Sequence, residues 1–245
     1  MPYQPVPLIP SEIKVKSGGY IYFLTGLGGV GKTTVAILGS QEIDVPLYYA
    51  NFDRDASHIL AKYKGELLYT ETFRRADTKA GALREIGRFR QFVDFARREK
   101  QGVFVLENIA AEWNIVSKAF LPDEDRPAPK EYADANGFQR SIILDLEDSG
   151  LTTVITGPVK EQWLSASKTS GLVEPDVWKH LQFHAVTEVY LFRTGKITAV
   201  PPVPTEALTC GDFKALIMEA KMNPIVIGTV LDNPILKDII AATSE

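Results

Sequence analysis

One segment limits the possible folds of this chain more than any other: the glycine-rich run G-L-G-G-V-G-K-T-T at residues 26–34. The residues before it, 20–25, read Y-I-Y-F-L-T, and this apolar, aromatic composition predicts a strand that is buried on both faces. Helix-forming residues follow the glycines over residues 32–40. A strand, a glycine-rich turn and a helix in this order predict the first unit of an α/β sheet.

Apolar runs and helical patterns alternate along the rest of the chain. The apolar runs predict further strands at residues 45–52, 103–106 and 151–156. The intervening segments predict helices at residues 80–100 and 132–148. Two later runs, 186–192 and 196–200, flank the turn R-T-G and predict a β-hairpin at the sheet edge. The expected fold is therefore α/β, with a mostly parallel central sheet flanked by helices.

Proline placement and the strand and helix pattern divide the 245 residues into three parts. Prolines at positions 2, 5, 7 and 10 exclude a helix near the start, so residues 1–18 are expected to form an extended arm. Residues 19–203 hold the α/β pattern and form the expected main domain. Residues 204–245 are expected to form a helical extension, with two short helices around Asn223-Pro224 and Asn233-Pro234.

Composition argues against several classes of protein. The formal net charge of −4 argues against a surface that binds nucleic acid everywhere, so any such binding needs a local basic patch. The sequence lacks an apolar stretch of the roughly 18 residues that a membrane span needs, and it lacks the features of a signal peptide. The single cysteine, Cys210, suits a reducing compartment. We therefore expect a cytoplasmic protein without a membrane partner.

The glycine-rich run has the residue types that hold a chain of phosphates. Its glycines and the K-T pair occupy the fixed positions of the P-loop pattern, between the expected strand and helix. Glycines allow main-chain amides to surround phosphates, and the helix N-terminus adds partial positive charge. Lys32 is expected to contact the β- and γ-phosphates of ATP, and the Thr33 hydroxyl to bind Mg²⁺. The expected nucleotide-binding residues are Gly26, Gly28, Gly29, Val30, Gly31, Lys32, Thr33 and Thr34.

Hydrolysis of ATP needs acidic groups beside the phosphates. An apolar strand pattern ends at Glu107, which is expected to bind the magnesium ion together with Thr33. Asp53 and Asp55 follow the strand after the P-loop helix, where a carboxylate can activate water, and Asp53 is the favoured of the two. Thr156, at the end of another strand, is either a sensor of the γ-phosphate or an ordinary strand residue. The expected catalytic residues are Lys32, Asp53 and Glu107.

Beyond the P-loop, the order of several segments is similar to that of a known family. A strand with its acidic end reads Y-Y-A-N-F-D, and an apolar strand ends in E-N. A helix then begins E-Y-A-D-A-N-G-F-Q-R and precedes T-T-V-I-T-G-P-V-K-E-Q-W. This order resembles the RecA-like ATPase domain of phage and archaeal-virus proteins over residues 19–193. That group includes the Sak-type ATPases, which are linked to single-strand annealing and recombination.

The resemblance implies a homo-oligomeric ATPase, a ring or a filament, that acts on single-stranded DNA in the host cytoplasm. It also implies that Asp53 activates water, that Glu107 is the acid on the metal side, and that Lys160 is a trans-acting cation. Two positions depart from the family pattern. Glu107 stands where aspartate is usual, and Gly157-Pro158 replaces a polar sensing residue followed by histidine.

Two regions are candidates for contact with DNA. Basic residues surround the helix expected at 80–100, where they form either a phosphate-binding stripe or a solvated helix face. The loop at 165–179 contains Trp178, which either stacks on a base or packs on the domain. A second function agrees with the same P-loop, namely a nucleotide-dependent assembly protein whose partner is another protein. The acidic composition favours this alternative slightly.

Overall fold

The computed structural model of the chain describes residues 19–53, 56–65, 67–122, 128–165, 168–176, 181–194 and 212–244. Its strands are β1 (Ile21–Thr25), β2 (Leu47–Asn51), β3 (Leu68–Thr72), β4 (Val103–Glu107), β5 (Thr152–Gly157), β6 (Val159–Ser165), β7 (Lys168–Pro175), β8 (Thr187–Thr194), β9 (Asp212–Ala220) and β10 (Val230–Asp232). Its α-helices are α1 (Lys32–Ser40), α2 (Ser57–Leu60), α3 (Lys79–Glu99), α4 (Ile109–Phe120), α5 (Ala133–Glu147), α6 (Leu181–His184) and α8 (Leu236–Ser244). Short 3₁₀ turns cover Gln41–Ile43, Pro129–Tyr132 and Pro224–Val226. Within these described ranges, none of the helices is long and apolar enough to cross a membrane.

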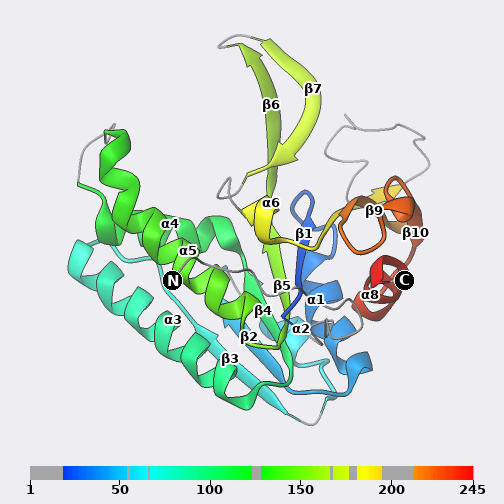
Figure 1. Ribbon diagram of the computed structural model, residues 1–245, viewed down its shortest axis with the longest axis horizontal. Coiled ribbons are helices and arrows are strands. Elements are labelled where there is room, and N and C mark those ends of the chain that lie inside the picture. Colours follow the sequence, from blue (N-terminus) through cyan, green and yellow to red (C-terminus); the bar gives the residue numbers. More distant parts are fainter. Residues whose placement is uncertain are drawn as a thin grey trace, which may run out of the picture.

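Eight of these strands form one sheet, in the order β10-β9-β8-β1-β5-β4-β2-β3 (Figure 1). Each neighbouring pair from β8 to β3 is parallel, whereas β9 pairs antiparallel with both β8 and β10. The prediction of an α/β fold with a mostly parallel central sheet flanked by helices is therefore confirmed. β6 and β7 form a separate antiparallel hairpin that projects from the rest of the molecule (Figure 1).

The alternation of side chains along β1 explains why helices cover both faces of the sheet. Ile21 and Phe23 pack into the core beneath α3, α4 and α5, whereas Tyr22 and Leu24 pack into the core beneath α1 and α8. All four side chains are at most 2% exposed, as a central parallel strand between two helical layers requires. Because the strands from β8 to β3 are parallel, their carboxyl ends share one edge of the sheet, and the candidate site lies at that edge.

The C-terminal segment differs from the prediction. The helical extension expected at 204–245 was wrong for residues 212–232, because β9 joins the main sheet beside β8 and β10 pairs with β9. Along β9, Ala215 and Ile217 are fully buried while Met218 is 49% exposed, and this period of two is that of a strand. Of the two expected helices, the described residues contain the second, as α8, while Pro224–Val226 is a short 3₁₀ turn.

The predicted edge hairpin is also different from the one observed. β8 confirms its first strand, but residues 196–200 lie outside the described part of the chain. Residues 212–220, as β9, are the antiparallel partner of β8 instead. The short helices α2 and α6 were not predicted, nor were β3, α4 and the β6–β7 hairpin, which includes part of the loop expected at 165–179.

Candidate functional site

The glycine-rich loop, residues 26–31, connects β1 to α1 at the carboxyl edge of the sheet. Gly26 has a φ angle of 149° and Gly31 one of 108°, conformations that residues with a side chain rarely adopt. A Cβ atom on Gly26 would lie 2.4 Å from the carbonyl oxygen of Leu191 in β8. Glycine is therefore required where the loop packs against β8. Gly31 is the N-cap residue of α1 and gives the first turn no capping side chain.

The side chain of Lys32 folds back over this loop. Its Nζ donates hydrogen bonds to the carbonyl oxygens of Gly26, at 2.8 Å, and Leu27, at 2.9 Å. Burial lowers the pKa of the Lys32 ammonium, while the carboxylates of Glu107 and Asp53 oppose this shift. The loop carbonyls thus hold the ammonium in place, close to two acidic groups.

Glu107, the last residue of β4, links α1 to β2 through its two carboxylate oxygens. Thr33 donates a hydrogen bond from its hydroxyl to Oε1, and the Tyr49 phenol donates one to Oε2 at 2.9 Å. Burial raises the pKa of Glu107, although the hydrogen bonds from Thr33 and Tyr49 oppose this rise. Burial also raises the pKa of Tyr49 above its ordinary value, so its phenol stays protonated and donates this hydrogen bond. The carboxylate is therefore fixed beside the first turn of α1.

Asp53 lies just beyond β2, next to the first residue after β4. Asn108 Nδ2 donates a hydrogen bond to Asp53 Oδ2 at 2.8 Å, and the Asp53 amide donates one to Asn51 Oδ1 at 3.0 Å. Asn108 is also the N-cap residue of α4, where its Oδ1 accepts a hydrogen bond from the Ala111 amide at 2.7 Å. The peptide bond between Glu107 and Asn108 is cis. Asn108 thus uses both ends of its side chain, one to begin α4 and one to hold Asp53.

The structure brings together four of the residues that the sequence singled out. Lys32 and Thr33 come from the start of α1, Glu107 from the end of β4, and Asp53 from the segment after β2. Hydrogen bonds and electrostatic interactions connect these groups at one edge of the sheet. Asp55, the alternative to Asp53, lies outside the described residues.

The other expected nucleotide-binding residues differ in exposure. Gly28, Gly29 and Thr34 are exposed, so this side of the loop is open to solvent. Val30 is 1% exposed and packs in the core beneath α1. The side chain of Val30 therefore anchors the loop, and only its main chain is suited to contact a ligand.

Three further residues were weighed for other roles. Thr156 is fully buried near the end of β5, and its hydroxyl finds no hydrogen-bond partner among the described residues. Lys160, the trans-acting cation that the resemblance implied, forms an ion pair with Asp176 at 3.0 Å next to the β6–β7 hairpin. Trp178 lies outside the part of the chain that the structure describes.

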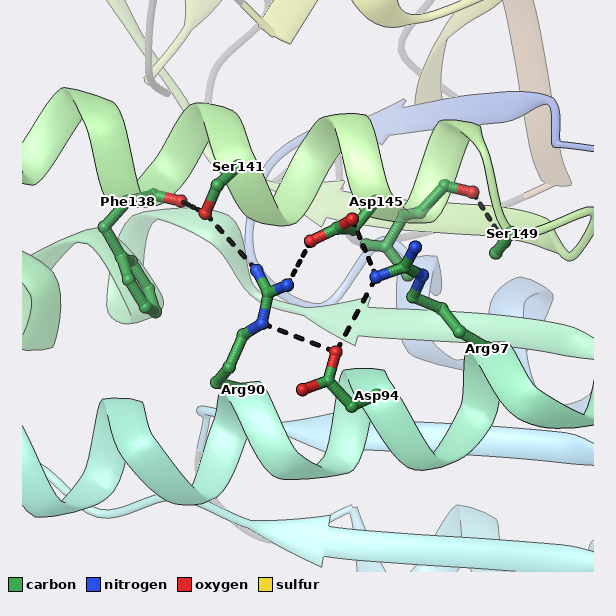
Figure 2. Close-up of polar contacts among 8 residues, drawn as sticks. Arg90, Asp94, Arg97, Phe138, Ser141, Asp145 and Ser149 are labelled. Carbon is green, nitrogen blue, oxygen red and sulfur yellow. Dashed lines mark hydrogen bonds and ion pairs between the residues drawn. The ribbon is translucent and has the colours of Figure 1, made fainter.

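Several arginines of the predicted basic stripe form ion pairs within the chain. Figure 2 shows Arg90 and Arg97 of α3 turned toward α5, where both pair with Asp145, Arg97 at 2.7 Å. Asp94 of α3 lies between them and pairs with Arg90 at 3.4 Å (Figure 2). Arg88 is paired as well, with two glutamates. These arginines therefore fix α3 to its neighbours, and their charges are partly neutralised.

A cleft opens beside Asp53. A cavity of about 360 Å³ is lined by Asp53 and Arg74, among others. A second cavity of about 580 Å³ shares Arg75, Asn114 and Ile115 with the first, so the two are adjacent. The cleft was not predicted, because α4 forms one of its walls and was itself missed. The space gives water or a second ligand access to the Asp53 carboxylate.

Sequence reasoning missed two residues that hold the site together, Tyr49 and Asn108. A signal existed for Asn108, since asparagine directly before a helix is a preferred N-cap residue. Tyr49 had no such local signal, because its contact with Glu107 depends on the pairing of β2 with β4.

Comparison with protein-family models and with curated proteins does not identify the function of this site. Neither a protein-family model nor a curated protein matches the chain. The function must therefore be inferred from the residues that meet at the glycine-rich loop.

Proposed function

We propose that this chain is a Mg²⁺-dependent ATPase of the P-loop class, with the glycine-rich loop as its phosphate-binding site. One arrangement supports this most: the Lys32 ammonium lies over the loop, and the Thr33 hydroxyl beside it is bonded to the Glu107 carboxylate. A cation, a hydroxyl and a carboxylate at the N-terminus of a helix match the needs of a triphosphate with its metal ion.

The loop and Lys32 are suited to the β- and γ-phosphates of ATP. Main-chain amides of the loop supply donors to phosphate oxygens, and the N-terminal partial charge of α1 favours an anion there. Lys32 would exchange its bonds to the carbonyl groups of Gly26 and Leu27 for stronger, charge-assisted bonds to phosphate. The same residue thus stabilises the loop and binds the ligand.

Thr33 and Glu107 are the residues that would hold Mg²⁺. Their hydrogen bond places a hydroxyl and a carboxylate oxygen side by side. Both are hard oxygen donors, and Mg²⁺ in triphosphate sites takes few protein ligands besides phosphate oxygens and water. When bound, the metal ion neutralises charge that develops on the phosphates during transfer. Tyr49 keeps Glu107 in position through the hydrogen bond to its other oxygen.

Asp53 is the proposed group that activates water. Its side chain is exposed at the carboxyl edge of the sheet, and Asn108 orients it through a hydrogen bond of 2.8 Å. The adjacent cavity of about 360 Å³ admits water to it. A carboxylate in this place can accept a proton from water as the water attacks the γ-phosphate.

Asp53→Asn is expected to reduce ATP hydrolysis by about 10²- to 10⁴-fold, the usual contribution of a general base, and to leave ATP binding close to wild type. The amide keeps the size of the side chain but accepts no proton. Phosphate release at saturating ATP and Mg²⁺ measures the effect. Asp44→Asn is the matched control, because Asp44 is exposed and precedes β2 at the opposite edge of the sheet. A wild-type rate in Asp53→Asn would refute the role of Asp53, and a wild-type chain that releases no phosphate would refute the ATPase.

The resemblance to RecA-like phage and archaeal-virus ATPases extends this proposal. It suggests a homo-oligomer, a ring or a filament, that acts on single-stranded DNA in recombination or annealing in the cytoplasm of a host cell. The order of the sequence segments supports this extension.

A nucleotide-dependent assembly protein with a protein partner is the second candidate. The ion pairs of Arg88, Arg90 and Arg97 favour it, because they neutralise part of the basic stripe that DNA would contact. Sedimentation with ATP and Mg²⁺, with and without single-stranded DNA, distinguishes the two. Assembly that requires DNA supports the first candidate, and complete assembly without DNA, together with no binding of labelled single strands, supports the second.

A further inference from the structure

The C-terminal end of β8 and the N-terminal end of β9 lie next to the glycine-rich loop. Arg193 and Phe213 are opposite each other in the register of these strands, and the guanidinium carbon lies 5.7 Å from the centre of the Phe213 ring. A Cβ atom placed on Gly31 would lie 3.6 Å from Phe213 Cε2 and 3.9 Å from Arg193 Nη2. The ring and the guanidinium group therefore lie beside the N-cap residue of α1, at the loop itself.

The sheet order determines on which side of the loop this pair lies. Glu107 ends β4 and Asp53 follows β2, and both strands lie on the side of β1 that β5 occupies. β8 and β9 lie on the other side of β1. A triphosphate that crosses the loop along the sheet, with its terminal phosphate at Glu107 and Asp53, would extend its other end toward Arg193 and Phe213.

We propose that Arg193 and Phe213 form a platform that binds the nucleoside part of the triphosphate. This inference rests on the proposed function and adds the place of the base and ribose. An aromatic ring and a planar guanidinium group both stack on nucleobases, and the positive charge suits the neighbouring phosphates. Stacking recognises the face of a base and not its edge, so the platform binds adenine and guanine nucleotides alike.

The main sheet holds this platform in place. The carbonyl group of Phe213 accepts a hydrogen bond from the Asn233 amide at 2.8 Å, and the next residue, Lys214, pairs with Asp232 of β10. The Phe213 ring is half-buried and packs against the core beneath α1. Substitution of the ring therefore leaves the main-chain pairing of β9 intact, and leucine at this position keeps most of the apolar contact.

Calorimetric titrations of the full chain with ATP, GTP and inorganic tripolyphosphate, each with Mg²⁺, test the platform. Tripolyphosphate has the phosphate chain but no nucleoside. Phe213→Ala and Phe213→Leu are expected to weaken ATP and GTP binding by similar factors, about tenfold or more, and to leave tripolyphosphate binding unchanged.

Arg193→Lys keeps the charge but removes the planar group, and the same selective loss is expected. Phe192→Ala is the control, because Phe192 precedes Arg193 in β8 and faces the opposite side of the sheet.

The possible outcomes distinguish a failure of the platform from a failure of the proposed function. Unchanged ATP affinity in the Phe213 variants, or an equal loss for tripolyphosphate, would overturn the platform. Wild-type chain that binds tripolyphosphate as tightly as ATP, with both lost in Lys32→Ala, would overturn the platform while the phosphate site stands. A wild-type chain that binds none of the three ligands would overturn both.

Discussion

Lys32→Ala is expected to lower the affinity for ATP with Mg²⁺ by at least about a hundredfold. Lys32 provides a positive charge at the loop, where two carbonyl oxygens hold its Nζ at 2.8 Å and 2.9 Å. Charge-assisted hydrogen bonds contribute about 1.5–3 kcal/mol each, and a lysine between the β- and γ-phosphates makes about two of them. Calorimetric titration with ATP and Mg²⁺ measures the loss.

The control for this substitution is Lys237→Ala, which removes an exposed lysine from α8. Circular dichroism should show the same helix content in both variants, because the Lys32 side chain is bonded only to loop carbonyls in the described structure. An ATP affinity in Lys32→Ala equal to that of the Lys237 variant would show that Lys32 does not bind the phosphates.

Glu112→Gln is expected to stabilise the folded chain, and by far more at pH 9 than at pH 5. Glu112 of α4 is fully buried, and burial raises the pKa of its carboxyl from 4.5 to about 8, with the neighbouring Gln139 opposing the rise. Since the folded pKa exceeds the unfolded one, the fold keeps the proton, and stability falls as the pH rises from 4.5 to about 8. Glutamine avoids this loss, which amounts to about 5 kcal/mol at pH 9 and about 1 kcal/mol at pH 5.

Urea unfolding at both pH values measures the difference in free energy of unfolding between Glu112→Gln and wild type. Glu42→Gln is the control, because Glu42 is exposed in the turn after α1 and its charge is solvated in both states. An equal effect of Glu112→Gln at pH 5 and pH 9, or a loss of stability at pH 9, would be inconsistent with a raised pKa at this position.

The central strands could be predicted because their own residues carry the signal. β1 and β4 are buried along their whole length, and burial on both faces requires the continuous apolar runs seen in the sequence. β3 is an edge strand whose residues are exposed or half-buried, so its composition does not stand out. α4 carries the buried Glu112 on its inner face, which interrupts the apolar pattern of a covered helix.

The residues of the candidate site also fall into two groups, those with a local sequence signal and those placed by strand pairing. Lys32 and Thr33 were found because their positions in the glycine-rich loop are local in sequence, and Glu107 because it ends an obvious strand. Tyr49 and the Arg193–Phe213 pair were not found, because their places depend on the pairing of β2 with β4 and of β8 with β9. No local pattern near these residues indicates either pairing.

Amide NMR spectra of ¹⁵N-labelled chain, recorded with Mg²⁺ before and after a non-hydrolysable ATP analogue is added, test the phosphate site most directly. We predict that the largest shifts occur at the amides of residues 28–34, because these are the groups proposed to donate to the phosphate oxygens. Spectra in which the loop amides do not move at saturating nucleotide, or in which shifts are confined to another surface, would contradict the site.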